Sequence, residues 1–216
     1  MKIPPLSPSS LLRRGFTLIE LLVVIVIIAI LVSLAVPATN IVMRKAQELK
    51  IKATLKDLQV AIGHYRTEYN RFPVDPNDIG AGGDTDMEPF LTDGTSSTMV
   101  NILMANVDTS SGSTNMNPRK IKFVDLPNAK NNQFGIIDPS GGSGDGAAVQ
   151  LVDTWGLPYK VLLDTNYDNR LENPDKNSND QIISGKAPEY LSASSAIYSF
   201  GPDKQEFTKD DIVSWR

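Results

Sequence analysis

Cysteine is absent from the 216-residue sequence. Disulfide bonds, thiolate metal sites and cysteine nucleophiles are therefore all excluded. A fold without covalent cross-links must be stabilised by side-chain packing or by bound ions. The composition, 41% hydrophobic and 21% charged, fits one globular domain plus an additional segment.

Histidine is nearly absent as well, because His64 is the only one in the chain. The sequence contains no nucleophile motif and no glycine-rich loop of the kind that cradles phosphate groups. Pairs of Asp and Glu are too common to indicate catalysis by themselves. We therefore predict that the protein is not an enzyme.

Positive charge is in the minority, since 21 Lys and Arg residues accompany 25 Asp and Glu residues for a net charge of −4. Lys2, Arg13 and Arg14 lie within the first fifteen residues, so loss of that segment would remove three positive charges and leave −7. Acidic proteins bind nucleic acid poorly, and we expect no nucleic-acid partner.

One long apolar run extends over residues 16–36, interrupted only by Thr17, Glu20 and Ser33. Its 21 residues match the roughly 20 that cross the hydrocarbon of a bilayer, so the run predicts a transmembrane helix. A secretory signal has a small-residue cleavage site after its apolar run, whereas here no such site follows the run and Arg13-Arg14-Gly15 precedes it. Charged residues flank both ends, and the two arginines that adjoin the run favour a cytoplasmic N-terminus.

Glu20 is the unusual residue of this run. A carboxylate within a membrane helix costs about 2.5 to 3.5 kcal/mol at the bilayer centre and less near an end. Either the side chain reaches the headgroup region, or a partner of opposite charge compensates the cost.

Residues 13–24, Arg-Arg-Gly-Phe-Thr-Leu-Ile-Glu-Leu-Leu-Val-Val, closely resemble the leader junction of type IV pilins and type II secretion pseudopilins. The resemblance implies that a prepilin peptidase cuts between Gly15 and Phe16 and that the new amine of Phe16 is N-methylated. It also implies that Glu20 pairs with the N-terminal amine of a neighbouring subunit during assembly.

The same resemblance implies a structural subunit of a pilus or pseudopilus that forms a filament in type II protein secretion. Its partners would be prepilin peptidase, further copies of itself, minor pseudopilins, an inner-membrane assembly platform and the lipid bilayer. The protein would cross the inner membrane once, with its head in the periplasm, and later join a periplasmic or extracellular filament.

Helical periodicity continues beyond the apolar run. The stripe recurs at steps of four and three residues and comprises Ile51, Leu55, Leu58, Ile62, Tyr65 and Tyr69. A helix over residues 16–69 would be about 80 Å long, with Pro37 kinking or loosening it, and Asn70-Arg71-Phe72-Pro73 would end it. We divide the chain into a leader (1–15), a transmembrane helix (16–36), an amphipathic continuation (37–72) and a head (73–216) with a loop-rich insertion at about 80–150.

The head has short apolar runs separated by turn residues, which predict a small antiparallel sheet over Ile121–Val124, Tyr159–Leu163 and Ala196–Phe200. A short helix is expected within residues 95–106, and Gly, Ser and Asn clusters at 80–83, 110–117 and 140–146 indicate loops. The fold class is therefore α+β, a long N-terminal helix packed on a small antiparallel sheet, as in pilins. Residues 153–159 resemble a Trp-Gly-x-Pro-Tyr segment of the major pseudopilin, to which we assign a structural role.

Residues 199–215 resemble the calcium loop that closes the head of the major pseudopilin of type II secretion. By that resemblance Asp203, Asp210 and Asp211 supply side-chain ligands to Ca²⁺, and Phe200 supplies a backbone carbonyl. Lys204 stands where the family usually has glycine. The alternative is a solvated acidic segment.

A second candidate resembles a dockerin-style calcium loop and consists of Asp164, Asn166, Asp168, Arg170 and Asp175. Asn169 occupies the usual glycine position, and asparagine tolerates the left-handed conformation needed there. A turn rich in Asx side chains, without a metal, explains the same residues equally well.

Two other functions remain open. A type IV pilin for adhesion or DNA uptake shares the leader junction, although the cysteine pair common in pilin heads is missing. A membrane-anchored calcium-binding module that keeps its leader uncleaved is the other alternative.

Overall fold

The computed structural model describes residues 15–75, 85–96, 98–106, 116–138 and 149–216, except for the side chains of residues 34–38. Residues 1–46 and 47–216 form separate compact units. The predicted leader and most of the predicted loops at 80–83, 110–117 and 140–146 lie outside the described residues.

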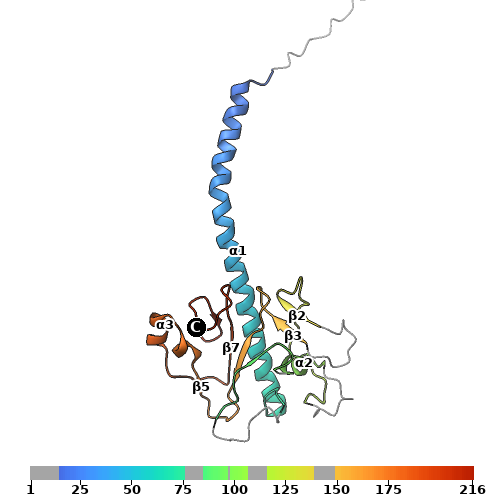
Figure 1. The fold of residues 1–216 in the computed structure, drawn as a ribbon. Helices are drawn as coiled ribbons and strands as arrows, with labels where there is room; N and C mark the ends of the chain where they lie inside the picture. Colours follow the sequence, from blue (N-terminus) through green and yellow to red (C-terminus); the bar gives the residue numbers. More distant parts are fainter. Residues whose placement is uncertain (1–14, 76–84, 97, 107–115, 139–148) are drawn as a thin grey trace, which may run out of the picture. The chain divides into compact units, whose positions relative to one another are not determined.

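Helix α1 runs from Leu18 to Tyr69 and continues through Pro37 (Figure 1). It ends as predicted at Asn70, which takes a left-handed conformation at φ 51° and donates its N–H to the Arg66 carbonyl. The predicted transmembrane segment includes residues 34–36, whose side chains are outside the described set. Within the described part of the chain, no helix is both long enough and apolar enough to cross a bilayer.

The 47–216 unit contains one four-stranded antiparallel sheet, which confirms the α+β fold class. Its order is β1-β4-β7-β8, with β4 and β7 paired through Lys160↔Tyr198 to Leu163↔Ser195. The strands of this sheet are β1 (Phe90–Leu91), β4 (Lys160–Leu163), β7 (Ser195–Ser199) and β8 (Ile212–Val213). Two smaller antiparallel pairs consist of β2 (Gly135–Ile137) with β3 (Gln150–Val152), and β5 (Leu171–Glu172) with β6 (Tyr190–Leu191). The remaining elements are α2 (Met99–Leu103), the 3-10 helix η1 (Pro174–Asn177) and α3 (Gln181–Lys186).

The predicted stripe of α1 forms the centre of the main core. Ile51, Leu55, Leu58, Ile62 and Tyr65 are at most 1% exposed, and they share one apolar cluster with α2 and the sheet. Figure 1 shows β7 running along the end of α1, with β2, β3 and α2 to one side of the helix and β5 and α3 to the other.

Alternate side chains of the central strands β4 and β7 belong to different cores, the main one and a second, smaller one. Val161, Leu163 and Ile197 belong to the cluster around α1, whereas Leu162 and Tyr198 belong to a cluster with Phe200 and Leu171. Successive side chains of a strand point to opposite faces of the sheet. The loops that carry the candidate sites therefore leave a sheet that is packed on both faces.

The predicted strand over Ile121–Val124 is wrong. The side chain of Asn117 replaces a partner strand there, because its Oδ1 accepts from the Ile121 N–H at 3.0 Å and its Nδ2 donates to the Ile121 carbonyl at 2.8 Å. The N–H of Phe123 donates to the Leu103 carbonyl at the end of α2. With these backbone groups already paired, the segment joins no sheet. The other two predicted strands are confirmed as β4 and β7, and the predicted short helix as α2.

Candidate functional site

The beginning of α1 is closed by a reciprocal capping box. Thr17 donates both its N–H and its hydroxyl to Glu20 Oε2, at 2.8 and 2.7 Å, and the Glu20 N–H donates to the Thr17 hydroxyl at 3.3 Å. Such a pair satisfies N–H groups that have no partner within a helix. Glu20 thus has a role within its own chain that we did not predict, in addition to the predicted role in assembly.

The predicted cleavage position lies just before this capping box. Gly15 and Phe16 are exposed and precede the helix, so their backbone is not held in helical hydrogen bonds. Phe16 is 76% exposed, and the large apolar residues of the helix as far as Val32 are between 45% and 88% exposed. This unit therefore presents an accessible junction followed by a long apolar surface.

The segment of residues 200–211, which we call the 200–211 loop, connects β7 to β8. Lys204 and Phe207 adopt positive φ angles of 61° and 66°, so Lys204 does take the conformation for which glycine is usual. Gly201 is also left-handed, and a Cβ there would come within 2.4 Å of the Asp210 carbonyl oxygen. The close approach of Gly201 to Asp210 folds the loop back on itself.

The three predicted aspartates of this loop are linked through Thr208 and the backbone. The Thr208 hydroxyl lies 2.8 Å from Asp210 Oδ1 and 3.2 Å from Asp211 Oδ1, and Asp210 Oδ2 accepts from the Asp203 N–H at 3.1 Å. A hydroxyl has one proton, so it can donate fully to only one of the two carboxylates. The three carboxylates do not gather into one cluster of metal-binding distance in the described structure.

The two neighbouring carboxylates of the loop differ in pKa. The pKa of Asp211 is raised to about 6, because burial and the nearby charge of Asp210 outweigh the hydrogen bonds from Thr208 and the Phe207 backbone that lower it. Burial also acts on Asp210, but hydrogen bonds from Thr208 and Asp203 outweigh it and lower the pKa of Asp210. The loop thus holds one stable carboxylate beside one that is costly to ionise.

Residues 164–170, the 164–170 loop, follow β4. Asp164 Oδ2 accepts from the Asn169 N–H at 3.1 Å, Asn166 Oδ1 from Asp168 at 2.9 Å, and Asp168 Oδ1 from Arg170 at 2.8 Å. Asn169 has a φ of 60°, as expected for its position. This is the Asx-rich turn that the sequence allows, and by itself it indicates no metal.

Asp86 joins this loop from a distant part of the sequence. Its Oδ1 accepts from the Asn166 N–H at 3.2 Å, and the next residue, Met87, donates its N–H to the Thr165 hydroxyl at 2.8 Å. Asp86, Asp164 and Asp168 each offer a carboxylate oxygen within 4.8 Å of the others. Burial raises the pKa of Asp86, as do the charges of Asp164 and Asp168.

Asp175, the predicted last residue of the second calcium loop, has other partners. Its carboxylate accepts from Trp215 Nε1 at 2.9 Å and from Arg216 Nε and Nη2 at 2.9 and 2.8 Å. Since η1 begins at Pro174 and directs Asp175 toward the end of the chain, this residue is not part of the acidic cluster.

Residues 153–159 have the structural role that we assigned to them. Asp153 is fully buried, and its Oδ1 accepts from the N–H groups of Trp155 and Leu157, while its Oδ2 accepts from the Ser199 hydroxyl at 2.6 Å. Gly156 occupies the left-handed position of this turn at φ 82°. The turn thereby fixes the start of β4 against the end of β7.

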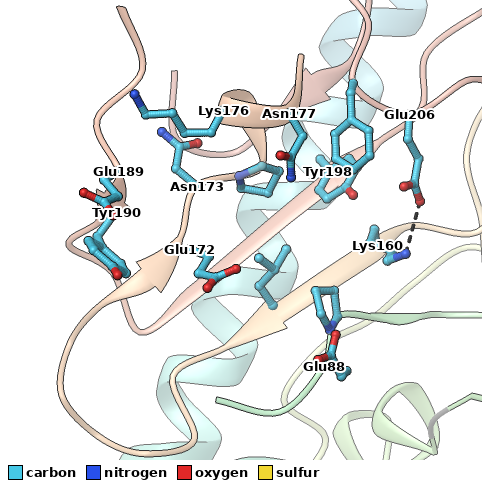
Figure 2. A pocket seen from close by; sticks show the side chains of 14 residues that line it. Glu88, Lys160, Glu172, Asn173, Lys176, Asn177, Glu189, Tyr190, Tyr198 and Glu206 are labelled. Carbon is cyan, nitrogen blue, oxygen red and sulfur yellow. Dashed lines mark hydrogen bonds and ion pairs between the residues drawn. The ribbon is translucent and has the colours of Figure 1, made fainter. Parts of the chain in front are cut away.

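A pocket of about 350 Å³ opens over β4 and β7 beside η1 (Figure 2). Its side chains include Glu88, Glu172, Glu189 and Glu206, and Glu206 forms an ion pair with Lys160 at 3.1 Å. Burial and the charges of Glu206 and Asp211 raise the pKa of the Tyr198 hydroxyl, so this hydroxyl stays protonated at neutral pH. The described lining carries carboxylate, lysine, tyrosine and asparagine side chains and contains no histidine, serine or threonine.

Comparisons with known proteins find one family motif and several similar proteins. Residues 11–36 match the family described as "Prokaryotic N-terminal methylation motif". A "Type II secretion system core protein G" of Pectobacterium carotovorum subsp. carotovorum is 41% identical over 28% of this chain and 39% of its own length. A protein of the same description in Klebsiella pneumoniae is 40% identical over 29% of this chain and 44% of its own. A "Type IV major pilin protein PilA" of Myxococcus xanthus (strain DK1622) is 34% identical over 37% of this chain and 35% of its own length.

The matched region spans less than half of each of these relatives. No solved structure matches the chain. The predicted resemblance to type IV pilins and type II secretion pseudopilins is confirmed, and that family is structural and not enzymatic.

Proposed function

We propose that this chain is a prepilin-type structural subunit, processed by prepilin peptidase and assembled into a pseudopilus that acts in type II protein secretion. The observation that carries the proposal is the motif of residues 13–24, which leads into the helix α1, and the apolar side chains at the beginning of α1 are exposed. Both features are required if the same segment is first a substrate of the peptidase and afterwards an assembly surface.

The exposed apolar surface of α1 is the physical argument for a membrane and a filament. Large apolar residues from Phe16 to Val32 are exposed, whereas soluble monomers seldom expose contiguous apolar patches above a few hundred Å². Lipid covers this surface while the subunit is in the inner membrane, with the N-terminus cytoplasmic and the head periplasmic. Neighbouring copies and minor pseudopilins cover it after the assembly platform has extracted the subunit.

Glu20 can serve both its own helix and a neighbouring subunit. Both donors of Thr17 bond to Oε2, and a carboxylate has capacity for further donors at its second oxygen. Cleavage after Gly15 creates a positively charged amine at Phe16. The amine of a neighbouring copy would neutralise Glu20 in an apolar filament core, where an unpaired charge is costly.

The first test is the mass of the mature N-terminus. We expect the chain to begin at N-methylated Phe16 when prepilin peptidase is co-expressed, and at Met1 with an inactive peptidase. A product that keeps its leader in the presence of active peptidase contradicts the proposal and favours the uncleaved calcium-binding module.

The second test separates the two roles of Glu20. Glu20→Gln keeps a side chain that can complete the capping box but has no charge, whereas Glu20→Ala removes both functions. If the charge pairs with a neighbouring amine, both variants are cleaved normally and both yield few sheared fibres. Normal fibre yield from Glu20→Gln would mean that Glu20 only caps its helix.

We include a calcium ion in the 200–211 loop as part of this function. Support comes from the resemblance of residues 199–215 to the pseudopilin calcium loop and from the repulsion between Asp210 and Asp211 at one hydroxyl. Phe200, Asp203, Asp210 and Asp211 would hold the ion, which would tie β8 to β7 in a head without disulfides.

A type IV pilin for adhesion or DNA uptake is the second candidate, and similarity to the Myxococcus xanthus pilin favours it. The two functions predict different losses on deletion of the gene. Loss of exoprotein release with unchanged surface pili supports the secretion pseudopilus, and the reverse supports the type IV pilin.

A further inference from the structure

The 164–170 loop and Asp86 form an acidic cluster that the function above does not use. Asp86 lies 78 residues before Asp164, yet the oxygens of Asp86, Asp164 and Asp168 lie within 4.8 Å of one another. Asp164 is buried, Asp86 is partly buried and Asp168 is exposed, so the cluster extends from the protein interior to the solvent.

The decisive group is the carboxylate of Asp164. This residue is only 1% exposed, and among the described residues its Oδ1 has no hydrogen-bond partner, while its Oδ2 accepts from the Asn169 N–H. A buried carboxylate oxygen without a donor is costly, and two neighbouring carboxylates increase the cost. A cation bound at Oδ1 would reduce the repulsion between the carboxylates and give Oδ1 the partner that it lacks.

Protein cations do not compensate the cluster in the described structure. Arg66 stacks its guanidinium on the rings of Phe72 and Tyr167, and Arg170 lies over the ring of Tyr190. Neither arginine forms an ion pair with the three carboxylates among the residues described. Among the described residues no Lys or Arg pairs with this cluster, so a bound cation would supply the neutralising charge.

We propose that Asp86, Asp164 and Asp168 bind one Ca²⁺ ion at a site separate from the 200–211 loop. Carboxylates are the hard oxygen ligands that Ca²⁺ prefers, and its flexible coordination of six to eight oxygens suits groups from a loop and a distant segment. The Asp168 side chain at the exposed edge gives solvent access for the ion and for water ligands. Mg²⁺ demands near-ideal octahedral geometry and fits such a set less well.

An ion at this position would join two segments that are already connected by hydrogen bonds, among them those from Met87 to Thr165 and from Asn166 to Asp86. The site would thus fix the segment before β1 to the loop after β4, and β1 and β4 are neighbours in the sheet. This inference holds whether or not the chain forms a filament.

The test measures calcium binding by the full-length chain in detergent. All variants carry Asp210→Asn and Asp211→Asn, so that binding in the 200–211 loop does not contribute. In that background Asp86→Asn, Asp164→Asn and Asp168→Asn each remove one proposed ligand charge. Asp125→Asn is the matched control, because it removes one negative charge from a side chain that is 85% exposed.

We expect one bound ion per chain in the background and in the control, and at least about tenfold weaker binding in each ligand variant. Since Asp164→Asn removes a buried charge, its melting temperature in EGTA should be no lower than that of the background. Asp86→Asn and Asp168→Asn keep the test decisive if Asp164→Asn does not fold. A background that binds no Ca²⁺, or ligand variants that bind it like the control, would overturn the proposal.

Discussion

Calcium removal should destabilise the head through the 200–211 loop. Asp211 is partly buried, and it shares the Thr208 hydroxyl with Asp210, so without an ion two adjacent carboxylates compete for one donor. At a Ca²⁺ concentration 100-fold above the dissociation constant, binding to the folded state alone adds about 2.7 kcal/mol to the free energy of unfolding. For a protein of this size, that corresponds to a rise in melting temperature of about 5 to 11 °C.

The assay compares melting temperatures of the full-length chain in detergent with EGTA and with added Ca²⁺. All samples carry Asp86→Asn and Asp168→Asn to weaken the second proposed site, and the test variant adds Asp210→Asn and Asp211→Asn. We expect the shift in the parent and its loss in the test variant. If the test variant keeps the full calcium-dependent shift, the assignment of the ion to this loop is wrong.

Two further predictions concern the stability of the head. The folded-state pKa of Asp211, about 6, is above its ordinary value of 3.8, so the folded state holds this proton more tightly. In EGTA the free energy of unfolding should therefore fall as the pH rises from about 4 to 6. The Asp211→Asn variant should show a smaller fall over the same pH range. An equal fall in the variant would mean that Asp211 does not cause the pH dependence. Leu58→Ala should lower the free energy of unfolding by about 2 to 5 kcal/mol in urea titrations, because Leu58 is fully buried on α1. Val60→Ala, at a position that is 44% exposed, should change it by less than about 0.5 kcal/mol, and equal losses would refute the orientation of the stripe.

Local patterns in the sequence predicted α1 and the central strands well. The α1 stripe keeps a regular helical spacing, and β4 and β7 are short apolar runs bounded by turn residues. The segment Ile121–Val124 has the same kind of pattern, but its backbone is paired by the side chain of Asn117. Such a contact depends on how the chain folds around Asn117, which apolar spacing does not indicate.

The sequence predicted two members of the acidic cluster, Asp164 and Asp168, but not Asp86. Asp164, Asn166 and Asp168 stand at recognisable spacings, and Asn169 has the left-handed backbone expected for it. Asp175 fitted the same spacing but bonds to Trp215 and Arg216 instead. Asp86 could not be found from spacing, because it is distant in the sequence and is brought to the loop by the pairing of β1 with β4 and by hydrogen bonds of its own segment.

The contacts between α1 and β7, a strand near the end of the chain, also have a consequence for how the head folds. Gln59 Nε2 donates to the Ser195 carbonyl, 136 residues further along, and Ile197 lies in the same core as the α1 stripe. Contacts at such separation require a large loss of chain entropy before they stabilise anything, so they form slowly. The stripe of α1 can contact α2 earlier, but it lacks its β7 partners until that strand has been synthesised and brought into place. A subunit that crosses a membrane from its N-terminus would have to keep this stripe from aggregating during that interval.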